Sequence, residues 1–247
     1  MVVLWIRERF RGTVSTHLIL FLSGGGRFVL KISASLLACD EAYLGETVME
    51  LERAGVDFIH LDVMDGHYVE NFAFSPKTVR DLRKITALPL EVHLEIDNPE
   101  RYIAIFAEAG ADIIIVQLDT VRHPIRVLKE IRSFGKKAGI AINPSDELGR
   151  VKYLAAYIDY LLLMSVEPGF GGQEFEESVV DKVNLAQSEF AKWGYSIPIG
   201  VDGGINFENV TLITQAGAEI VVVGTALFSQ PNFCEAVTLF RQLGGFR

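Results

Sequence analysis

One short pattern recurs along this chain: a small residue, usually followed by glycine, then an acidic residue, and then a run of apolar residues. It is written "AGVDFIHLDV" from Ala54, "AGADIIIVQL" from Ala109 and "AGAEIVVVGT" from Ala216, with a degenerate copy, "AYIDYLLLMS", from Ala156. Glycine commonly follows the last turn of a helix, and a short apolar run rich in β-branched residues is typical of a buried strand. Each copy therefore predicts the passage from a helix into a strand.

Four further apolar runs fill the gaps between these copies. They are "KISASLL" from Lys31, "LPLEVHLEI" from Leu88, "KAGIAIN" from Lys137 and "IPIGVD" from Ile197. The segments between the runs favour helices, for example those opened by Asn98 and Pro99 and by Asn206. Eight apolar strands alternating with helices predict an α/β fold, a single-domain (β/α)8 TIM barrel over residues 31–247, with an open doubly wound sheet as the alternative.

Residues 1–30 differ from the rest of the chain in charge. Four arginines stand there against the single acidic residue Glu8, although the whole chain of 247 residues has a net charge of -9. The apolar run Leu18–Leu22 is much shorter than the ~20 residues that a membrane-spanning helix needs. We expect residues 1–30 to be a poorly ordered N-terminal extension or the result of a misplaced start, with a targeting segment as the less favoured alternative.

Composition narrows the choice of partners and of compartment. The acidic net charge and the lack of a basic stripe argue against nucleic acid and against membranes as partners. The two cysteines, Cys39 and Cys234, are far apart in the sequence and have no metal-binding spacing. So few cysteines are typical of a reducing compartment, and we expect the protein to be cytoplasmic.

Histidines and aspartates stand at the ends of three predicted strands: His60 and Asp62 in the second, His93 in the third and Asp202 in the seventh. Side chains alternate along a strand, so His60 and Asp62 share one face, and active sites of this fold lie at these strand ends. Two imidazoles and two carboxylates suit a divalent metal ion. Taken singly, each histidine could instead be a hydrogen-bonded core residue, and Asp65 is expected to be a turn residue.

Glycines cluster after the last three predicted strands. They are Gly171 and Gly172 after the sixth strand, Gly203 and Gly204 after the seventh, and Gly224, followed by Thr225, after the eighth. Backbone N–H groups beside glycine can approach an anion closely, and (β/α)8 enzymes often hold phosphate in these loops. Tight turns would account for any one pair, but three neighbouring loops of this kind predict a phosphorylated ligand.

Several motifs between Lys31 and Arg241 resemble those of the ribulose-phosphate 3-epimerase family. They are "SASLL", "HLDVMDGHYVEN", "EVHLEI", "LLMSVEPGFGGQ" and "VDGGIN", in the family's order. The resemblance implies a homo-oligomer, dimer or hexamer, that acts on a small phosphosugar with one divalent ion: Zn, Fe, Mn or Co. The implied metal ligands are His60, Asp62, His93 and Asp202. The implied substrate contacts are Ser35, Met64, His93, Met164 and the six glycine-loop residues named above.

Members of this family interconvert D-ribulose 5-phosphate and D-xylulose 5-phosphate by inverting carbon 3. Removing a proton α to a carbonyl requires an enediolate to be stabilised, which a divalent ion can do as a Lewis acid. Inversion also requires a base on one face of the planar intermediate and an acid on the other. The expected catalytic pair is Asp62 and Asp202, which exchange roles between the two directions of the reaction.

Three residues depart from the family's pattern. Glu70 stands where the family usually has proline, Glu95 where it has methionine, and Gln117 where histidine is common. Gln117 is not expected to bind the metal. Glu95 lies two residues after His93 and so on the same face, where a carboxylate would repel a phosphosugar or add a metal ligand, unless the strand has already ended and Glu95 is solvated. From sequence alone, Glu95→Met is expected to leave activity intact or raise it.

Three other functions are weighed against pentose-phosphate epimerisation. A ketohexose phosphate such as D-allulose 6-phosphate could be the substrate of the same reaction. A catalytically silent phosphosugar-binding barrel is favoured by Glu70 and Glu95. A decarboxylase or aldolase-like synthase is disfavoured, because the lysine that such an enzyme needs two residues after Asp62 is replaced by Met64, which cannot supply a proton.

Overall fold

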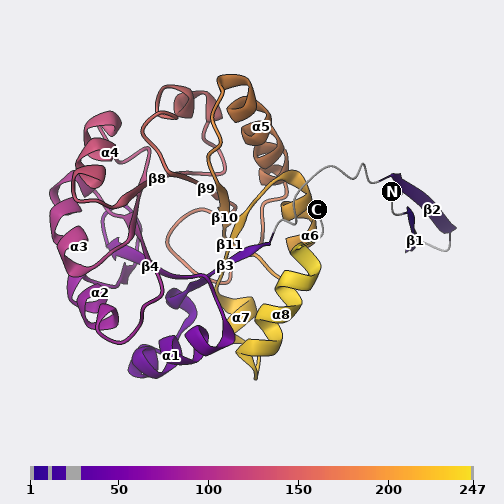
Figure 1. The fold of residues 1–247 in the computed structure, drawn as a ribbon, viewed down its shortest axis with the longest axis horizontal. Helices are drawn as coiled ribbons and strands as arrows, with labels where there is room; N and C mark the ends of the chain where they lie inside the picture. Colours follow the sequence, from indigo (N-terminus) through magenta and orange to yellow (C-terminus); the bar gives the residue numbers. More distant parts are fainter. Residues whose placement is uncertain (1–2, 11–12, 21–28, 246–247) are drawn as a thin grey trace.

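The computed structural model describes residues 3–10, 13–20 and 29–245, and within the last range the chain forms a closed barrel (Figure 1). The parallel strands of the barrel are β3 (Lys31–Ser35), β4 (Phe58–Asp65), β6 (Leu90–Glu95), β7 (Ile113–Gln117), β8 (Lys137–Ile142), β9 (Tyr160–Met164), β10 (Ile199–Asp202) and β11 (Ile220–Val223). Because β3 pairs with both β4 and β11, the sheet has no open ends. The predicted (β/α)8 barrel is confirmed, and the open sheet is excluded.

Helices surround the ring of strands, as Figure 1 shows. They are α1 (Leu44–Ala54), α2 (Pro76–Arg83), α3 (Ile103–Ala109), α4 (Pro124–Ser133), α5 (Ser178–Trp193), α6 (Val210–Ala216), α7 (Thr225–Phe228) and α8 (Phe233–Gly244). In the three copies that contain glycine, Gly55, Gly110 and Gly217 each end a helix, and Gly55 and Gly110 do so in the left-handed conformation. Asn206 opens a turn before α6 rather than the helix itself, because its side chain accepts the N–H groups of Glu208 and Asn209.

Short elements complete the connections. They are the two-residue strand β5 (Phe72–Ala73), antiparallel to β4, and the 3-10 helices η1 (Leu36–Ala38), η2 (Glu41–Tyr43), η3 (Pro99–Arg101) and η4 (Leu148–Tyr153). Asn98 precedes η3 and does not cap it with its side chain, so the helix predicted there begins as a 3-10 turn and continues as α3.

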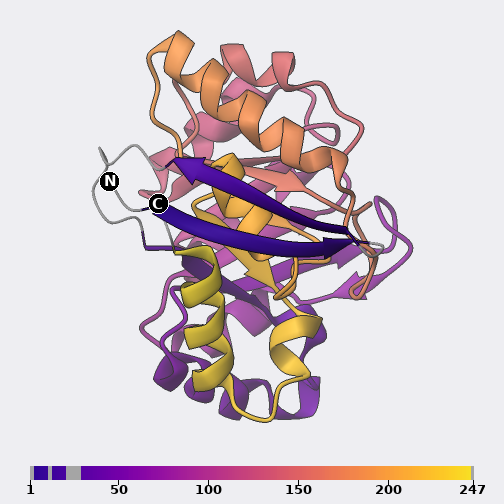
Figure 2. The ribbon, with the colours of Figure 1, turned by 90° about the vertical axis from the view of Figure 1, so that its right-hand side faces the viewer.

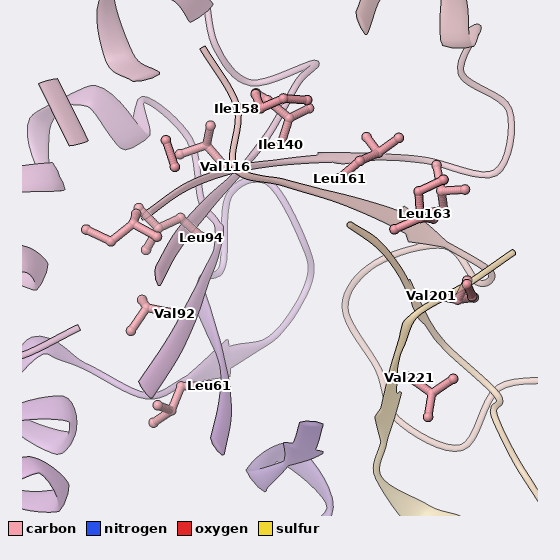
Figure 3. Packing of buried hydrophobic residues seen from close by; sticks show 14 of the residues in the cluster. Leu61, Val92, Leu94, Val116, Ile140, Ile158, Leu161, Leu163, Val201 and Val221 are labelled. Carbon is pink, nitrogen blue, oxygen red and sulfur yellow. The ribbon is translucent and has the colours of Figure 1, made fainter. Parts of the chain in front are cut away.

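Alternation along the strands separates two apolar layers. Side chains such as Leu61, Val92 and Leu94 belong to the large cluster between the strands and the helices (Figure 3). A smaller cluster, which includes Ile115 and Leu162, fills the interior of the barrel. In β4 and β6, the residues that alternate with these outward-facing ones therefore point into the barrel, where the polar side chains of the predicted site lie.

The acidic residues of the repeated pattern stabilise the N-terminal ends of the strands. Asp57, Asp112 and Asp159 each accept a hydrogen bond, of 2.8 to 2.9 Å, from the backbone N–H at or near the start of a neighbouring strand. Each also pairs with an arginine of the helical layer: Arg241, Arg83 and Arg132, respectively. The repeat thus encodes one structural device, used three times at the end of the barrel away from the predicted site.

Residues before the barrel form an antiparallel hairpin of β1 (Val3–Phe10) and β2 (Thr13–Leu20), a two-stranded sheet of its own (Figure 2). Residues 1–2, 11–12 and 21–28 of the predicted extension, and residues 246–247 at the end of the predicted barrel domain, lie outside the described residues. Within the described part of the chain, no helix combines the length and the apolar character that crossing a membrane requires.

Candidate active site

Four side chains from three strands meet at the C-terminal end of the barrel. They are His60 and Asp62 of β4, His93 of β6 and Asp202 of β10, and one potential ligand atom of each lies within 4.8 Å of the others. Both histidines are fully buried, whereas the two aspartates reach the wall of a cavity. The structure therefore brings together the four residues that the sequence predicted as metal ligands.

A buried glutamate orients His60. Oε2 of Glu91 lies 2.7 Å from Nδ1 of His60 and accepts a 2.6 Å hydrogen bond from the Ser33 hydroxyl. With its Nδ1 proton donated to Glu91, His60 directs Nε2 towards Asp62 Oδ1 at 3.0 Å and Asp202 Oδ2 at 3.5 Å. A carboxylate behind a histidine in this way fixes the tautomer that binds a metal and makes the ring a stronger ligand.

The two aspartates have different affinities for protons. Burial would raise the pKa of Asp62, but His60 and His93 outweigh it and lower that pKa below its ordinary value. Burial raises the pKa of Asp202 to about 7, with the neighbouring carboxylates of Asp62 and Glu91 adding to the shift and His60 opposing it. A pair of acids whose pKa values are pushed apart is suited to opposite roles in proton transfer.

His93 lies between Asp62 and two residues singled out in the sequence, Glu95 and Gln117. Its Nδ1 lies 3.3 Å from Asp62 Oδ1 and 3.7 Å from Glu95 Oε1, and its Nε2 lies 3.1 Å from the Gln117 amide nitrogen. Gln117 therefore lies behind His93, on the side away from Asp62, and is not one of the four clustered residues. Burial raises the pKa of Glu95 well above its ordinary value, and Asp62 and Asp202 raise it further.

The predicted phosphate loops line the same cavity as the aspartates. Its wall includes Ser35, Met64, Met164, Gly171, Gly172, Gly203, Gly204, Gly224 and Thr225. Ser35 donates a 2.9 Å hydrogen bond to Asp62 Oδ2. Glycine is required at 204, where φ is +63° and a Cβ atom would lie 2.8 Å from the backbone nitrogen of Phe175. All the predicted substrate-binding residues thus border the cavity, except His93, which is buried behind it.

Glu91 and Ser33 were not predicted from the sequence to belong to the site. Alternation offered a signal, because Glu91 lies two residues before His93 and so shares its inward face. The contact with His60 additionally depends on the register of β4 and β6, in which His60 and Glu91 are directly paired. Asp65 ends β4 and accepts the backbone N–H groups of His67 and Tyr68, which confirms it as a turn residue.

Comparison with known proteins agrees with this geometry. The chain matches the model of the "Ribulose-phosphate 3 epimerase family" over residues 31–228. It is 40% identical over 214 residues to the ribulose-phosphate 3-epimerase of Bacillus subtilis, covering 86% of this chain and 99% of that one. It is 42% identical over 208 residues to the chloroplastic ribulose-5-phosphate-3-epimerase of Arabidopsis thaliana, covering 83% and 74%. The solved structure of KGPDC from Streptococcus mutans is similar in fold alone, with a TM-score of 0.66 at 13% identity, covering 87% and 97%.

Proposed function

The chain belongs to the ribulose-phosphate 3-epimerase family, and we propose that it inverts carbon 3 of D-ribulose 5-phosphate to form D-xylulose 5-phosphate. One observation carries the proposal: Asp62 of β4 and Asp202 of β10 reach the wall of one cavity, and both carboxylates lie within 3.5 Å of Nε2 of His60. Two acid–base groups that approach a substrate from different strands can serve its opposite faces. Inversion of a carbon centre requires this arrangement.

In the proposed reaction one aspartate removes the proton from carbon 3 while the other, protonated, delivers a proton to the opposite face. In the metal-free site the pKa of Asp62 is lowered and that of Asp202 is raised, which supports this pairing because the two carboxyl groups differ in their affinity for a proton. In the reverse direction the two exchange roles. After one turnover the base carries a proton and the acid has lost one. The starting protonation states return when the reverse reaction runs or when the two carboxyl groups exchange protons with solvent.

The four clustered residues fit one divalent metal ion. Two imidazole nitrogens and two carboxylate oxygens are donors that Zn, Fe, Mn and Co all accept, and the contact of Nδ1 with Glu91 leaves Nε2 as the nitrogen of His60 that would bind. When bound, the ion supplies positive charge that stabilises negative charge on the substrate's oxygens. His60 and His93 contribute by holding the aspartates in place from behind the cavity.

The rest of the cavity supports a phosphosugar as the ligand. The loops after β9, β10 and β11 offer backbone N–H groups at Gly171, Gly172, Gly203, Gly204, Gly224 and Thr225 for the phosphate. Met64 and Met164 supply an apolar wall beside the reacting carbons, and both are almost fully buried. Ser35, hydrogen-bonded to Asp62, is placed to bind a substrate oxygen once that aspartate has turned to the substrate.

The test is isotope exchange at carbon 3. Purified protein loaded with Zn, Fe, Mn or Co is incubated with D-ribulose 5-phosphate in heavy water, and NMR follows deuterium at carbon 3 and the appearance of D-xylulose 5-phosphate. We expect both signals with metal and neither after chelation. A parallel incubation uses D-allulose 6-phosphate, and exchange on that sugar alone would change the assigned substrate. Metal binding without exchange on either sugar would contradict the proposal and favour a silent barrel.

We also propose that the protein works in the cytoplasm as a homo-oligomer, a dimer or a hexamer. The free thiols of Cys39 and Cys234 suit a reducing compartment. Exposed apolar side chains on or beside α3 and α4, namely Tyr102, Ile105 and Ile125, offer a surface for a second copy. Light scattering of the purified protein measures the mass in solution, and a monomeric mass would contradict the oligomer.

A further inference from the structure

Glu95 is a buried carboxyl group that reaches the cavity without a hydrogen-bond partner. Its side chain is 2% exposed and borders the same cavity as Asp62 and Met64. No described group donates a hydrogen bond to its Oε2, and its Oε1 lies 3.7 Å from His93 Nδ1, beyond hydrogen-bonding distance. Burying a carboxyl group without hydrogen bonds destabilises a fold by ~1–3 kcal/mol or more, so a ligand that donates to it would recover that loss.

The position of Glu95 is set by the barrel and not by a mobile loop. It is the last residue of β6, and in the strand register it is paired with Met64 of β4. Alternation along β6 directs Glu91, His93 and Glu95 to the interior, whereas Val92 and Leu94 join the outer apolar cluster. Glu95 is therefore a fixed part of the cavity wall.

Glu95 lies across the barrel from the glycine loops. In the closed order of strands, β7, β8 and β9 separate β6 from β10 on one side, and β4, β3 and β11 separate them on the other. The cavity therefore extends from the glycine loops after β9, β10 and β11, past Asp202 and Asp62, to Glu95. A ligand held at both the glycine loops and the aspartates has its remaining end directed towards β6.

This geometry assigns a contact to each end of the substrate, and the assignment rests on the proposed function. D-ribulose 5-phosphate has its phosphate at one end, the reacting carbon 3 in the middle and a hydroxymethyl group, carbon 1, at the other end. With phosphate at the glycine loops and carbon 3 between the aspartates, carbon 1 lies towards β6. We propose that Glu95 accepts a hydrogen bond from the carbon 1 hydroxyl and so determines specificity for ketose phosphates with a free hydroxyl at that carbon.

The proposal reverses what the sequence alone led us to expect of Glu95. A carboxylate near a phosphosugar is unfavourable when it faces the phosphate, but here it lies at the opposite end, where the substrate offers a neutral donor. Methionine at this position would remove the acceptor and leave the hydroxyl buried without a partner. A site built to hydrogen-bond a hydroxyl discriminates strongly against an analogue that lacks it.

The experiment compares two substrates that differ only in the carbon 1 hydroxyl: D-xylulose 5-phosphate and 1-deoxy-D-xylulose 5-phosphate. Deuterium exchange at carbon 3 gives kcat/KM for both, with the metal-loaded wild type, Glu95→Met and Glu95→Gln. We expect the wild type to lose about tenfold to a hundredfold on the deoxy substrate, because that sugar leaves the buried carboxyl group without a donor. Glu95→Met is expected to lose a similar factor on D-xylulose 5-phosphate but nothing further on the deoxy sugar. Glu95→Gln, which keeps an acceptor oxygen, is expected to lie between the two.

Two results would overturn the role of Glu95 while leaving the proposed function standing. One is equal kcat/KM of the wild type on both substrates, a comparison that needs no variant to fold. The other is a parallel loss on both substrates in Glu95→Met with unchanged metal content, which would indicate a general disturbance of the site. If the metal-loaded wild type exchanges neither sugar, the proposed function fails, and this inference fails with it.

Discussion

Carboxylates at the two ends of the barrel have opposite surroundings. At the N-terminal end, Asp57, Asp112 and Asp159 each bind a strand N–H group and an arginine. At the C-terminal end, Asp62 and Asp202 reach one cavity and meet only histidines and other carboxylates among their described charged neighbours. The same residue type is thus satisfied by the protein at one end and left for a ligand at the other.

This difference follows from what each end must do. A paired carboxylate that also accepts a backbone N–H group stabilises the fold, and its function is complete once the chain has folded. Buried like charges without a cation destabilise it, and such clusters are typical of sites that a ligand completes. Removing a carboxylate should therefore reduce activity at the C-terminal end and stability at the N-terminal end.

The largest effect is expected for Asp202→Asn. This variant removes one of the two proton carriers, so kcat/KM measured by carbon 3 exchange should fall by about 10³-fold or more. Its metal-free form should unfold at the same temperature as the wild type or higher, because the raised pKa of Asp202 shows that ionisation there is unfavourable. Asp57→Asn is the isosteric control at the other end and should keep its activity. Substantial turnover by Asp202→Asn would contradict the two-base scheme.

Metal removal is expected to have the next largest effect, and its size should depend on pH. The folded-state pKa values of Asp202 and His60 are both raised. Burial is the main cause for Asp202. For His60, burial alone would lower the pKa, but the carboxylates of Asp62 and Glu91 outweigh it. Groups with raised pKa values stabilise the metal-free fold while protonated, so the stability that these two groups contribute should fall as pH rises from about 4 through 7 and beyond.

A metal ion must displace these protons, so its affinity should rise over the same range. Metal at about 100 times its Kd stabilises a protein by ~2.7 kcal/mol. Calorimetric Tm values with metal and with chelator should therefore differ more at pH 8 than at pH 6. A difference that shrinks as pH rises would contradict the assignment of Asp202 and His60 as ligands.

At the N-terminal end of the barrel, Asp57→Ala tests whether the carboxylates there stabilise the fold. Oδ2 of Asp57 accepts hydrogen bonds from the Ile32 N–H at 2.8 Å and from Arg241 at 2.9 Å, so alanine leaves the Ile32 N–H without this acceptor and removes the ion pair with Arg241. We expect the free energy of unfolding to fall by about 1–3 kcal/mol, with kcat/KM unchanged. Urea denaturation followed by circular dichroism measures the first quantity and carbon 3 exchange the second. Unchanged stability would show that the repeated acidic residues do not stabilise the barrel.

The barrel and the four clustered residues were predictable because they depend on local patterns. The apolar runs mark the strands, and alternation places His60 and Asp62 on one face. The arginine partners were not predictable, because Asp57 and Arg241 lie far apart in the sequence and meet only in the closed barrel. Glu91 was missed because its role depends on strand register, and the orientation of Glu95 relative to the phosphate end depends on strand order.

Asp65 tests whether a carboxylate's role is decided by its location in the barrel or by its hydrogen bonds. Substituting it is expected to have the smallest effect of the changes considered. It lies at the C-terminal end of β4, yet its side chain accepts the backbone N–H groups of His67, Tyr68 and Asp97 at 2.9 to 3.1 Å. If satisfied hydrogen bonds decide the role, Asp65→Ala should behave like Asp57→Ala: the free energy of unfolding falls by ~1 kcal/mol, and activity changes little.

The pH dependence of this variant distinguishes the loss of a charged acceptor from a loss of packing. Burial opposes the shift, but the three N–H groups lower the pKa of Asp65 below its ordinary value. A lowered pKa contributes stability that is present above the unfolded-state pKa of about 3.9 and is lost as pH falls through the folded-state value. The difference between wild type and Asp65→Ala in urea denaturation should therefore shrink in acid. A large loss of activity at neutral pH with unchanged stability would instead mean that location at the C-terminal end, and not hydrogen bonding, decides what a carboxylate does in this barrel.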